Sequence, residues 1–123
     1  MAKTIKVFLS RQILIAYDGT KESFKFDCAT GDKSHPTTPG LFPIFKKDRK
    51  HFSHKYKVQM DYAMFFTQDG KAIHMSHLVG PVSLLKSLGM NSFGSHGCVR
   101  LSEADAAALF DWTPLHTVVA VVP

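Results

Sequence analysis

The sequence predicts a predominantly β fold with one substantial helix, and three observations lead to this prediction. Side chains alternate at a period of two along residues 5–10, 13–17 and 23–28, as expected of strands with one buried face. The Asp-Gly pair at 18–19 is typical of a β-hairpin turn. The segment SEADAAALFDW at 102–112 instead begins with a capping box and continues with helix-forming residues. We therefore expect a β domain with its one long helix near the C-terminal end.

The second half of the chain predicts further strands and one short helix. The stretch HPTTPGLFPIF at 35–45 is rich in turn residues and leads into a strand. MDYAMFF at 60–66 and KAIHM at 71–75 flank a Gln-Asp-Gly turn and predict a second hairpin, with His74 near its end. PVSLLKSLG at 81–89 predicts at most two helical turns, and the apolar run 117–122 predicts a strand buried on both faces.

The length and composition favour a single compact domain spanning residues 1–123. A chain of 123 residues with 45% hydrophobic content is expected to bury roughly two-thirds of its unfolded surface. No apolar run reaches the roughly 18–20 residues of a membrane span, and no signal-peptide core precedes the first strand. We therefore expect a domain without a membrane span or an export signal. We also expect it to be a monomer.

Positive charge is concentrated in one short segment. The formal net charge is +5, and eight lysine, arginine and histidine side chains lie between residues 46 and 57. Such a cluster favours acidic partners. The segment has neither a helical stripe nor a recognition module, so we expect no nucleic-acid partner and interpret it as a solvated loop or a contact for an anionic polymer.

The two cysteines are predicted to have different roles. Cys28 has the parity of Phe24 and Phe26 on its strand, which places it in the core. Cys98 lies in GSHGCVRL, beside Arg100 and just before the predicted helix, where positive charge and backbone N–H groups favour a thiolate. A disulfide between the two is an alternative, although two cysteines are not a disulfide framework. Cys98 is thus the candidate nucleophile.

A cysteine nucleophile needs a general base within hydrogen-bond reach. His96 is two positions from Cys98 on an extended segment, where side chains point the same way without their functional atoms necessarily meeting. A histidine from another strand therefore has the better geometry. His74 and His77 are the two candidates.

These segments together resemble the YkuD-type L,D-transpeptidase catalytic domain. The signature of that family is a strand-borne histidine followed by Ser/Thr-His-Gly-Cys, an aliphatic residue and Arg or Asn, which is similar to AIH at 72–74 and SHGCVRL at 95–101. The opening hairpin, CATG at 28–31 and PTTPGLFPI at 36–44 also resemble family segments. The chain departs from the family at Cys28-Ala29, at Pro39 and in a longer loop between the two histidine motifs. The resemblance implies a β-sandwich with one helix after the cysteine and a short helix in a flap loop.

The resemblance also implies a cysteine acyltransferase that acts on peptidoglycan stem peptides without a metal or other cofactor. Cys98 would attack the carbonyl between the third residue and D-Ala in position four, and an amine or water would resolve the thioester. Ser95, His96, Gly97 and Arg100 match motif positions that shape the acyl pocket. A location in the cell envelope or periplasm would follow from this substrate.

The choice of base stays open between two histidines. His74 matches the strand-end Ile-His motif but leaves twenty residues before Ser95, whereas His77 leaves seventeen and fits the customary spacing. We favour His74, because a general base is best held by a rigid element, and keep His77 as the alternative.

Other functions are compatible with the same residues. An L,D-carboxypeptidase or a secreted toxin against the cell wall would use the same fold and thioester chemistry. A binding-only domain would hold peptidoglycan without cleaving it, but would have no need of both the cysteine and the histidine. A zinc module would use His74, His77, His96 and Cys98 as ligands, although structural zinc sites usually contain two or more cysteines.

Overall fold

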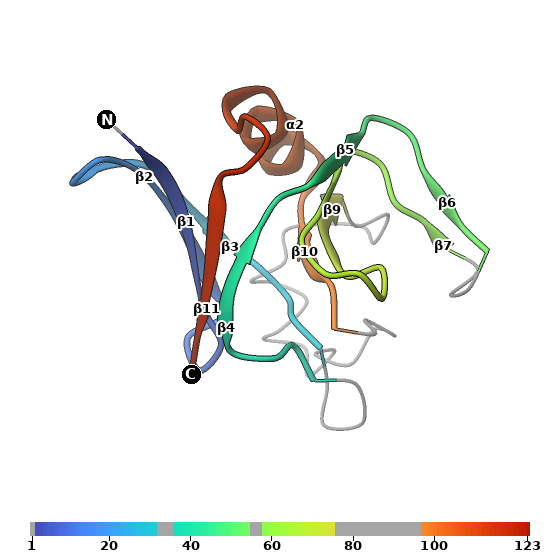
Figure 1. The fold of residues 1–123 in the computed structure, drawn as a ribbon, viewed down its shortest axis with the longest axis horizontal. Helices are drawn as coiled ribbons and strands as arrows, with labels where there is room; N and C mark the ends of the chain where they lie inside the picture. Colours follow the sequence, from blue (N-terminus) through green and yellow to red (C-terminus); the bar gives the residue numbers. More distant parts are fainter. Residues whose placement is uncertain (1, 32–35, 55–57, 76–96) are drawn as a thin grey trace.

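Two larger β-sheets, a two-stranded ribbon and one helix are the regular elements of the described part of the chain (Figure 1). The structure is a computed structural model and describes residues 2–31, 36–54, 58–75 and 97–123. The first sheet has the strand order β3 (Lys21–Asp27), β2 (Ile13–Asp18), β1 (Lys3–Phe8), β11 (Val118–Val122) and β4 (Gly40–Pro43). The second sheet has the order β10 (Val99–Leu101), β9 (Ala72–Met75), β8 (Ala63–Phe65) and β5 (Lys46–Asp48). A separate two-stranded ribbon consists of β6 (Phe52–Ser53) and β7 (Val58–Gln59), and helix α2 covers Glu103–Trp112.

The first sheet begins as the predicted meander. β1 pairs antiparallel with β2, and β2 with β3, and the turn between β2 and β3 contains Gly19 at φ 64°. The C-terminal strand β11 then pairs with β1 in parallel and with β4 antiparallel, so it lies inside the sheet. The two ends of the chain therefore contribute neighbouring strands.

The second sheet carries both of the sequence motifs that surround His74 and Cys98. β8 and β9 form the predicted hairpin, with Met64 opposite Ile73. β10 pairs with β9 in parallel, which places segments that are distant in the sequence side by side. The segment after β3 also reaches this sheet, since Ala29 forms an antiparallel bridge with Arg100.

The main core lies between the two sheets and is closed by α2. It contains inward-facing residues of both sheets and of the helix: Ile5, Val7, Leu14, Ala16, Val119 and Val121 from the first sheet, Met64, Ile73, Met75, Val99 and Leu101 from the second, and Ala106, Leu109 and Phe110 from α2. Cys28 belongs to the same cluster and is fully buried, as its parity predicted. Neither cysteine forms a disulfide, so the disulfide alternative is wrong. The mainly β fold with a helix after the cysteine is confirmed.

Helix α2 begins where its capping residue predicted. Ser102 has an extended backbone, and its Oγ accepts a hydrogen bond of 3.4 Å from the backbone N–H of Asp105. The helix ends at Thr113, whose N–H and hydroxyl both donate to Leu109 O, at 3.0 and 2.7 Å. The second helix predicted from the sequence, at 81–89, lies outside the described residues.

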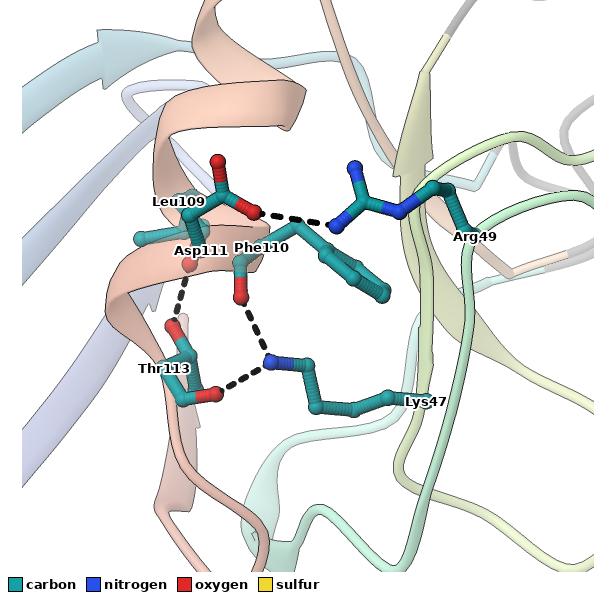
Figure 2. A network of polar contacts seen from close by, with 6 residues as sticks. All are labelled: Lys47, Arg49, Leu109, Phe110, Asp111 and Thr113. Carbon is teal, nitrogen blue, oxygen red and sulfur yellow. Dashed lines mark hydrogen bonds and ion pairs between the residues drawn. The ribbon is translucent and has the colours of Figure 1, made fainter.

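Lysines from both sheets bind the C-terminal end of α2, whose own last turn has no basic residue. Figure 2 shows the contacts of one of them, Lys47. Lys47 of β5 donates to Phe110 O at 2.5 Å and to Thr113 O at 2.6 Å, while Lys3 of β1 donates to Trp112 O at 2.8 Å. Cations stabilise this end of a helix because the last carbonyls carry a partial negative charge. Part of the basic segment therefore stabilises the fold and is not a solvated loop.

The neighbouring ion pair in Figure 2 is more exposed. Arg49 contacts the Asp111 carboxylate at 3.3 Å, with 60% and 68% of the two side chains accessible to solvent. The Arg49 guanidinium also lies 5.1 Å from the centre of the Phe110 ring.

Within the described ranges, no helix has the length and hydropathy that a membrane crossing requires.

Candidate active site

Cys98 and His74 lie on the same face of the second sheet. In the parallel pairing of β9 with β10, Arg100 is opposite His74 and Val99 is opposite Ile73. Because side chains alternate along a strand, Cys98 and Arg100 point away from the main core, as His74 does. The buried residues form two clusters that agree with this orientation. Cys98 lies outside the main core, in a second small cluster with Met60, Ala63, Phe65 and Ala72. Register thus brings together two groups that are 24 positions apart.

His74 is buried and oriented by the backbone of its own strand. Its side chain is 3% exposed, and Nδ1 lies 2.7 Å from the carbonyl oxygen of Met75. A carbonyl can only accept, so Nδ1 carries the hydrogen and Nε2 has the lone pair in the neutral ring. This tautomer leaves Nε2 able to take a proton, as a general base requires.

The environment of Cys98 favours the neutral thiol. Burial raises the pKa of the Cys98 thiol above its usual value, and this effect exceeds the lowering by a backbone hydrogen bond from Ala72 and by the charges of Arg100 and Lys71. The sequence-based expectation that the neighbours of Cys98 favour a thiolate holds for those neighbours, but the net pKa shift has the opposite sign because burial outweighs them. The positive charges are present, but only 4% of the residue is exposed, so desolvation of the anion dominates. A thiol in this environment needs a base to remove its proton if it is to act as a nucleophile.

The Arg100 side chain lies on the same buried sheet face as Cys98, and the Arg100 backbone is hydrogen-bonded to the first half of the chain. Its backbone N–H donates to Ala29 O at 2.8 Å, and its carbonyl accepts from Ala29 N at 3.0 Å. Burial lowers the pKa of the guanidinium, whereas the proximity of Cys98 raises it. An arginine keeps its proton at neutral pH in either case, so Arg100 is a permanent cation beside the sulfur.

Gly97 is required by its backbone conformation and by its neighbours. Its φ is 97°, a region that side chains disfavour. A Cβ at this position would require the flexible end of the Lys71 side chain to shift and would lie 3.2 Å from the backbone oxygen of Pro36. Its carbonyl accepts a 2.8 Å hydrogen bond from the buried hydroxyl of Thr37. Gly97 itself therefore lies close to two other parts of the chain.

Two residues near Cys98 were missed by the sequence analysis. Lys71 lies against Gly97, and Thr37 binds its carbonyl. No sequence pattern distinguishes Thr37 from the adjacent Thr38, and only the long-range contact identifies it. Three predicted site residues, His77, Ser95 and His96, lie outside the described residues, so their predicted roles stay predictions.

The described residues do not assemble a metal site. Among residues 2–31, 36–54, 58–75 and 97–123, no group of three or more histidine, cysteine, aspartate and glutamate side chains could bind a metal ion. Two of the four candidate zinc ligands, His77 and His96, are not among these residues. The arrangement described here, a buried thiol with an oriented histidine on the same sheet face, suits proton transfer and nucleophilic attack.

Two comparisons relate this chain to known proteins, and a third gave no match. A family model described as the YkuD L,D-transpeptidase catalytic domain matches residues 2–121. An L,D-transpeptidase (Yku) from Stackebrandtia nassauensis has a similar crystal structure, with a TM-score of 0.87 at 30% sequence identity, over 100% of this chain and 56% of that one. A comparison with curated proteins gave no match.

Two further solved structures show the likeness of fold at lower identity. L,D-transpeptidase 3 from Mycobacterium tuberculosis, solved with a faropenem-derived adduct, has a TM-score of 0.80 at 21% identity, over 99% of this chain and 60% of that one. The L,D-transpeptidase LdtMt1, solved in complex with imipenem, has a TM-score of 0.80 at 23% identity, over 98% and 59%. The chain spans 56–60% of the length of these three solved proteins.

A β fold that presents a buried cysteine and an oriented histidine on one sheet face fits the class of cysteine-dependent acyl-transfer domains. The match over residues 2–121 makes the assignment more specific: the chain belongs to the YkuD family of L,D-transpeptidase catalytic domains. The two-sheet architecture with its single described helix is the architecture of that family.

Proposed function

We propose that this protein is a cysteine acyltransferase that cleaves peptidoglycan stem peptides between the third residue and D-Ala in position four. The observation that carries the proposal is the placement of His74 and Cys98 on one face of paired strands, with His74 Nδ1 bound to Met75 O. Family membership supports the same chemistry and implies cell-wall peptides as substrates.

Acylation begins with proton transfer. His74 Nε2 takes the proton from the Cys98 thiol, and the sulfur attacks the carbonyl carbon of the third residue. The carbonyl electrons move to its oxygen, where backbone N–H groups beside Cys98 stabilise the developing charge. The C–N bond then breaks, the proton passes from His74 to the leaving nitrogen, and D-Ala departs from a thioester on Cys98.

The thioester is resolved by a second nucleophile. An amine attacks the thioester carbonyl, His74 accepts its proton, and the sulfur leaves with that proton restored. A side-chain amine of another stem peptide gives a cross-link, and a free D-amino acid gives exchange. Water gives an L,D-carboxypeptidase, which is the alternative outcome, as is use of the same reaction by a cell-wall-targeting toxin.

The remaining features of the proposal follow from the family and the sequence motif. His77 is the alternative base, and Ser95, His96, Gly97 and Arg100 shape the acyl pocket. The catalytic unit is one domain over residues 1–123, acts as a monomer and uses no cofactor. The substrate places it in the cell envelope or periplasm.

Defined muropeptides test this proposal. The protein is incubated with tetrapeptide and pentapeptide muropeptides, with and without a D-amino acid acceptor, and the products are identified by mass spectrometry. We expect loss of D-Ala from the tetrapeptide and its replacement by the acceptor, and no reaction with Cys98→Ala. Cys28→Ala is the matched control and should remain active, because Cys28 lies in the main core. An unchanged tetrapeptide in every mixture would contradict the proposal.

A further inference from the structure

The hydroxyl of Thr37 connects two backbone segments beneath the cysteine. Gly31 N–H donates to Thr37 Oγ1 at 2.9 Å, and Oγ1 donates to Gly97 O at 2.8 Å. The residue is 3% exposed. An amide N–H only donates and a carbonyl only accepts, so the single hydroxyl hydrogen is directed at Gly97 O. The direction of this hydrogen bond is therefore determined by its two partners.

The hydrogen bond to Gly97 O also orients the N–H group of Cys98. Gly97 C=O and Cys98 N–H belong to one planar peptide unit, and no cis peptide bond occurs among the described residues. In a trans unit the two groups point in opposite directions. A contact that holds the carbonyl therefore holds the N–H, which belongs to the same residue as the nucleophilic sulfur.

We propose that Thr37 is a positioning residue for the oxyanion hole. Its hydroxyl holds the Gly97–Cys98 peptide so that the Cys98 N–H faces the oxygen of the acyl group under attack. The inference rests on the proposed function, because an oxyanion develops only if Cys98 attacks a carbonyl. Oxyanion donors act through preorganisation, so the group that sets their direction affects the rate.

The segment around Gly31, which donates to Thr37 Oγ1, is itself fixed by hydrogen bonds. Thr30, the neighbour of Gly31, exchanges two hydrogen bonds with the side chain of Gln12, at 2.6 and 3.0 Å. Gln12 lies in the β1–β2 turn at φ 53° and also binds Leu9 O at 2.8 Å. These hydrogen bonds, together with the peptide bond between Thr30 and Gly31, thus connect the first hairpin to Gly97. Such support is needed for a donor to keep its geometry during the reaction.

Two reactions of the Cys98 sulfur can distinguish a positioning role of Thr37 from a purely structural role. A carbapenem acylates Cys98 when the sulfur attacks the lactam carbonyl, the C–N bond breaks and the ring nitrogen takes a proton, and this path develops an oxyanion. Iodoacetamide alkylates Cys98 when the sulfur displaces iodide from a methylene carbon, and this path develops none. A defect in the oxyanion hole should therefore slow the first reaction only.

The test compares Thr37→Val with Thr37→Ser in these two reactions. Thr37→Val has the native shape without the hydroxyl, and its rate of acylation by imipenem, followed by intact-mass spectrometry, should fall roughly 10- to 100-fold. Thr37→Ser keeps the hydroxyl and should retain most of the rate. Alkylation of Cys98 by iodoacetamide should be unchanged in both variants. Thr113→Val is the matched control, because it loses a buried 2.7 Å hydroxyl–carbonyl bond to Leu109 outside the site.

Each outcome decides between the possible roles. Acylation of Thr37→Val at the wild-type rate, or a parallel fall in acylation and alkylation, would overturn the positioning role. Absence of any adduct on the wild-type protein would overturn the proposed function and this inference with it. If Thr37→Val does not fold, Thr37→Ala, which is smaller than the native side chain, carries the same comparison.

Discussion

His74 Nδ1 lies 2.7 Å from the carbonyl oxygen of Met75, the next residue on the same strand. In many catalytic sites a carboxylate orients the histidine. Here a backbone carbonyl selects the neutral tautomer that has its lone pair on Nε2. Burial raises the pKa of the Cys98 thiol, so in the proposed mechanism His74 takes the thiol proton as the sulfur attacks.

Replacing the base should separate the two candidate histidines. His74→Ala should lower the rate of acyl transfer by about 100- to 10,000-fold, as expected for loss of a general base, and His77→Ala should lower it far less. The measurement is the rate of carbapenem adduct formation, with circular dichroism to show that both variants are folded. The reverse order of the two effects would make His77 the base.

The protonation state of Cys98 predicts a pH dependence. In His74→Ala, the rate of alkylation by iodoacetamide should follow the fraction of thiolate. Because burial raises the pKa of Cys98, the midpoint should lie above the ordinary thiol value of about 8.5, with low reactivity at neutral pH that increases as the pH rises. A midpoint below the ordinary value would show that Arg100 and Lys71 outweigh burial.

The two cysteines should differ in reactivity. Cys28 is 0% exposed within the main core, while Cys98 lies in the separate cluster on the opposite face of the second sheet. Native alkylation followed by peptide mapping should label Cys98 well before Cys28, and a carbapenem should add once per chain, at Cys98. Equal labelling of both thiols, or an adduct on Cys28, would contradict the assignment of the nucleophile.

Gly97→Ala should damage both stability and activity. The variant combines a disfavoured φ of 97°, which costs about 1–3 kcal/mol, with a close approach to the Pro36 backbone oxygen and a forced shift of the Lys71 side chain. Gly70→Ala is a matched control, since its φ is 95° but a Cβ there meets no atom within 4 Å. Urea denaturation should show a larger loss for Gly97→Ala, and only this variant should lose imipenem acylation. Similar behaviour of the two variants would show that the close approach at Gly97 has no effect.

Lys47→Met should destabilise the fold without impairing the thiol. It removes the cation that binds Phe110 O and Thr113 O, and loss of these charge-assisted bonds at a helix end is expected to lower the free energy of unfolding by about 1–3 kcal/mol. Arg49→Ala removes an exposed ion pair with Asp111 and should lower it by no more than about 1 kcal/mol. Urea denaturation distinguishes the two, and a larger effect of Arg49→Ala would refute the capping role of Lys47.

Much of the fold could be predicted because its signals are local. The Asp18-Gly19 turn, the cap at Ser102 and the helix that follows depend on residues within a few positions of one another. The burial of Cys28 followed from the period of two along its strand. Patterns of this kind indicate where elements begin and which side of each is apolar. They do not indicate which strands pair, so the parallel pairing of β1 with β11 and of β9 with β10 came only from the structure.

The sequence alone thus identified Cys98 as the candidate nucleophile and His74 as the preferred base, through residue types and a motif that resembles one family. The tertiary structure decided that these two side chains share a sheet face, that the Cys98 pKa is raised and not lowered, and that Thr37 binds the carbonyl of Gly97, 60 positions away. The physical reason is the same in each case. Register, burial and long-range hydrogen bonds arise when two sheets pack against each other, and their energies depend on neighbours in space that no local pattern specifies.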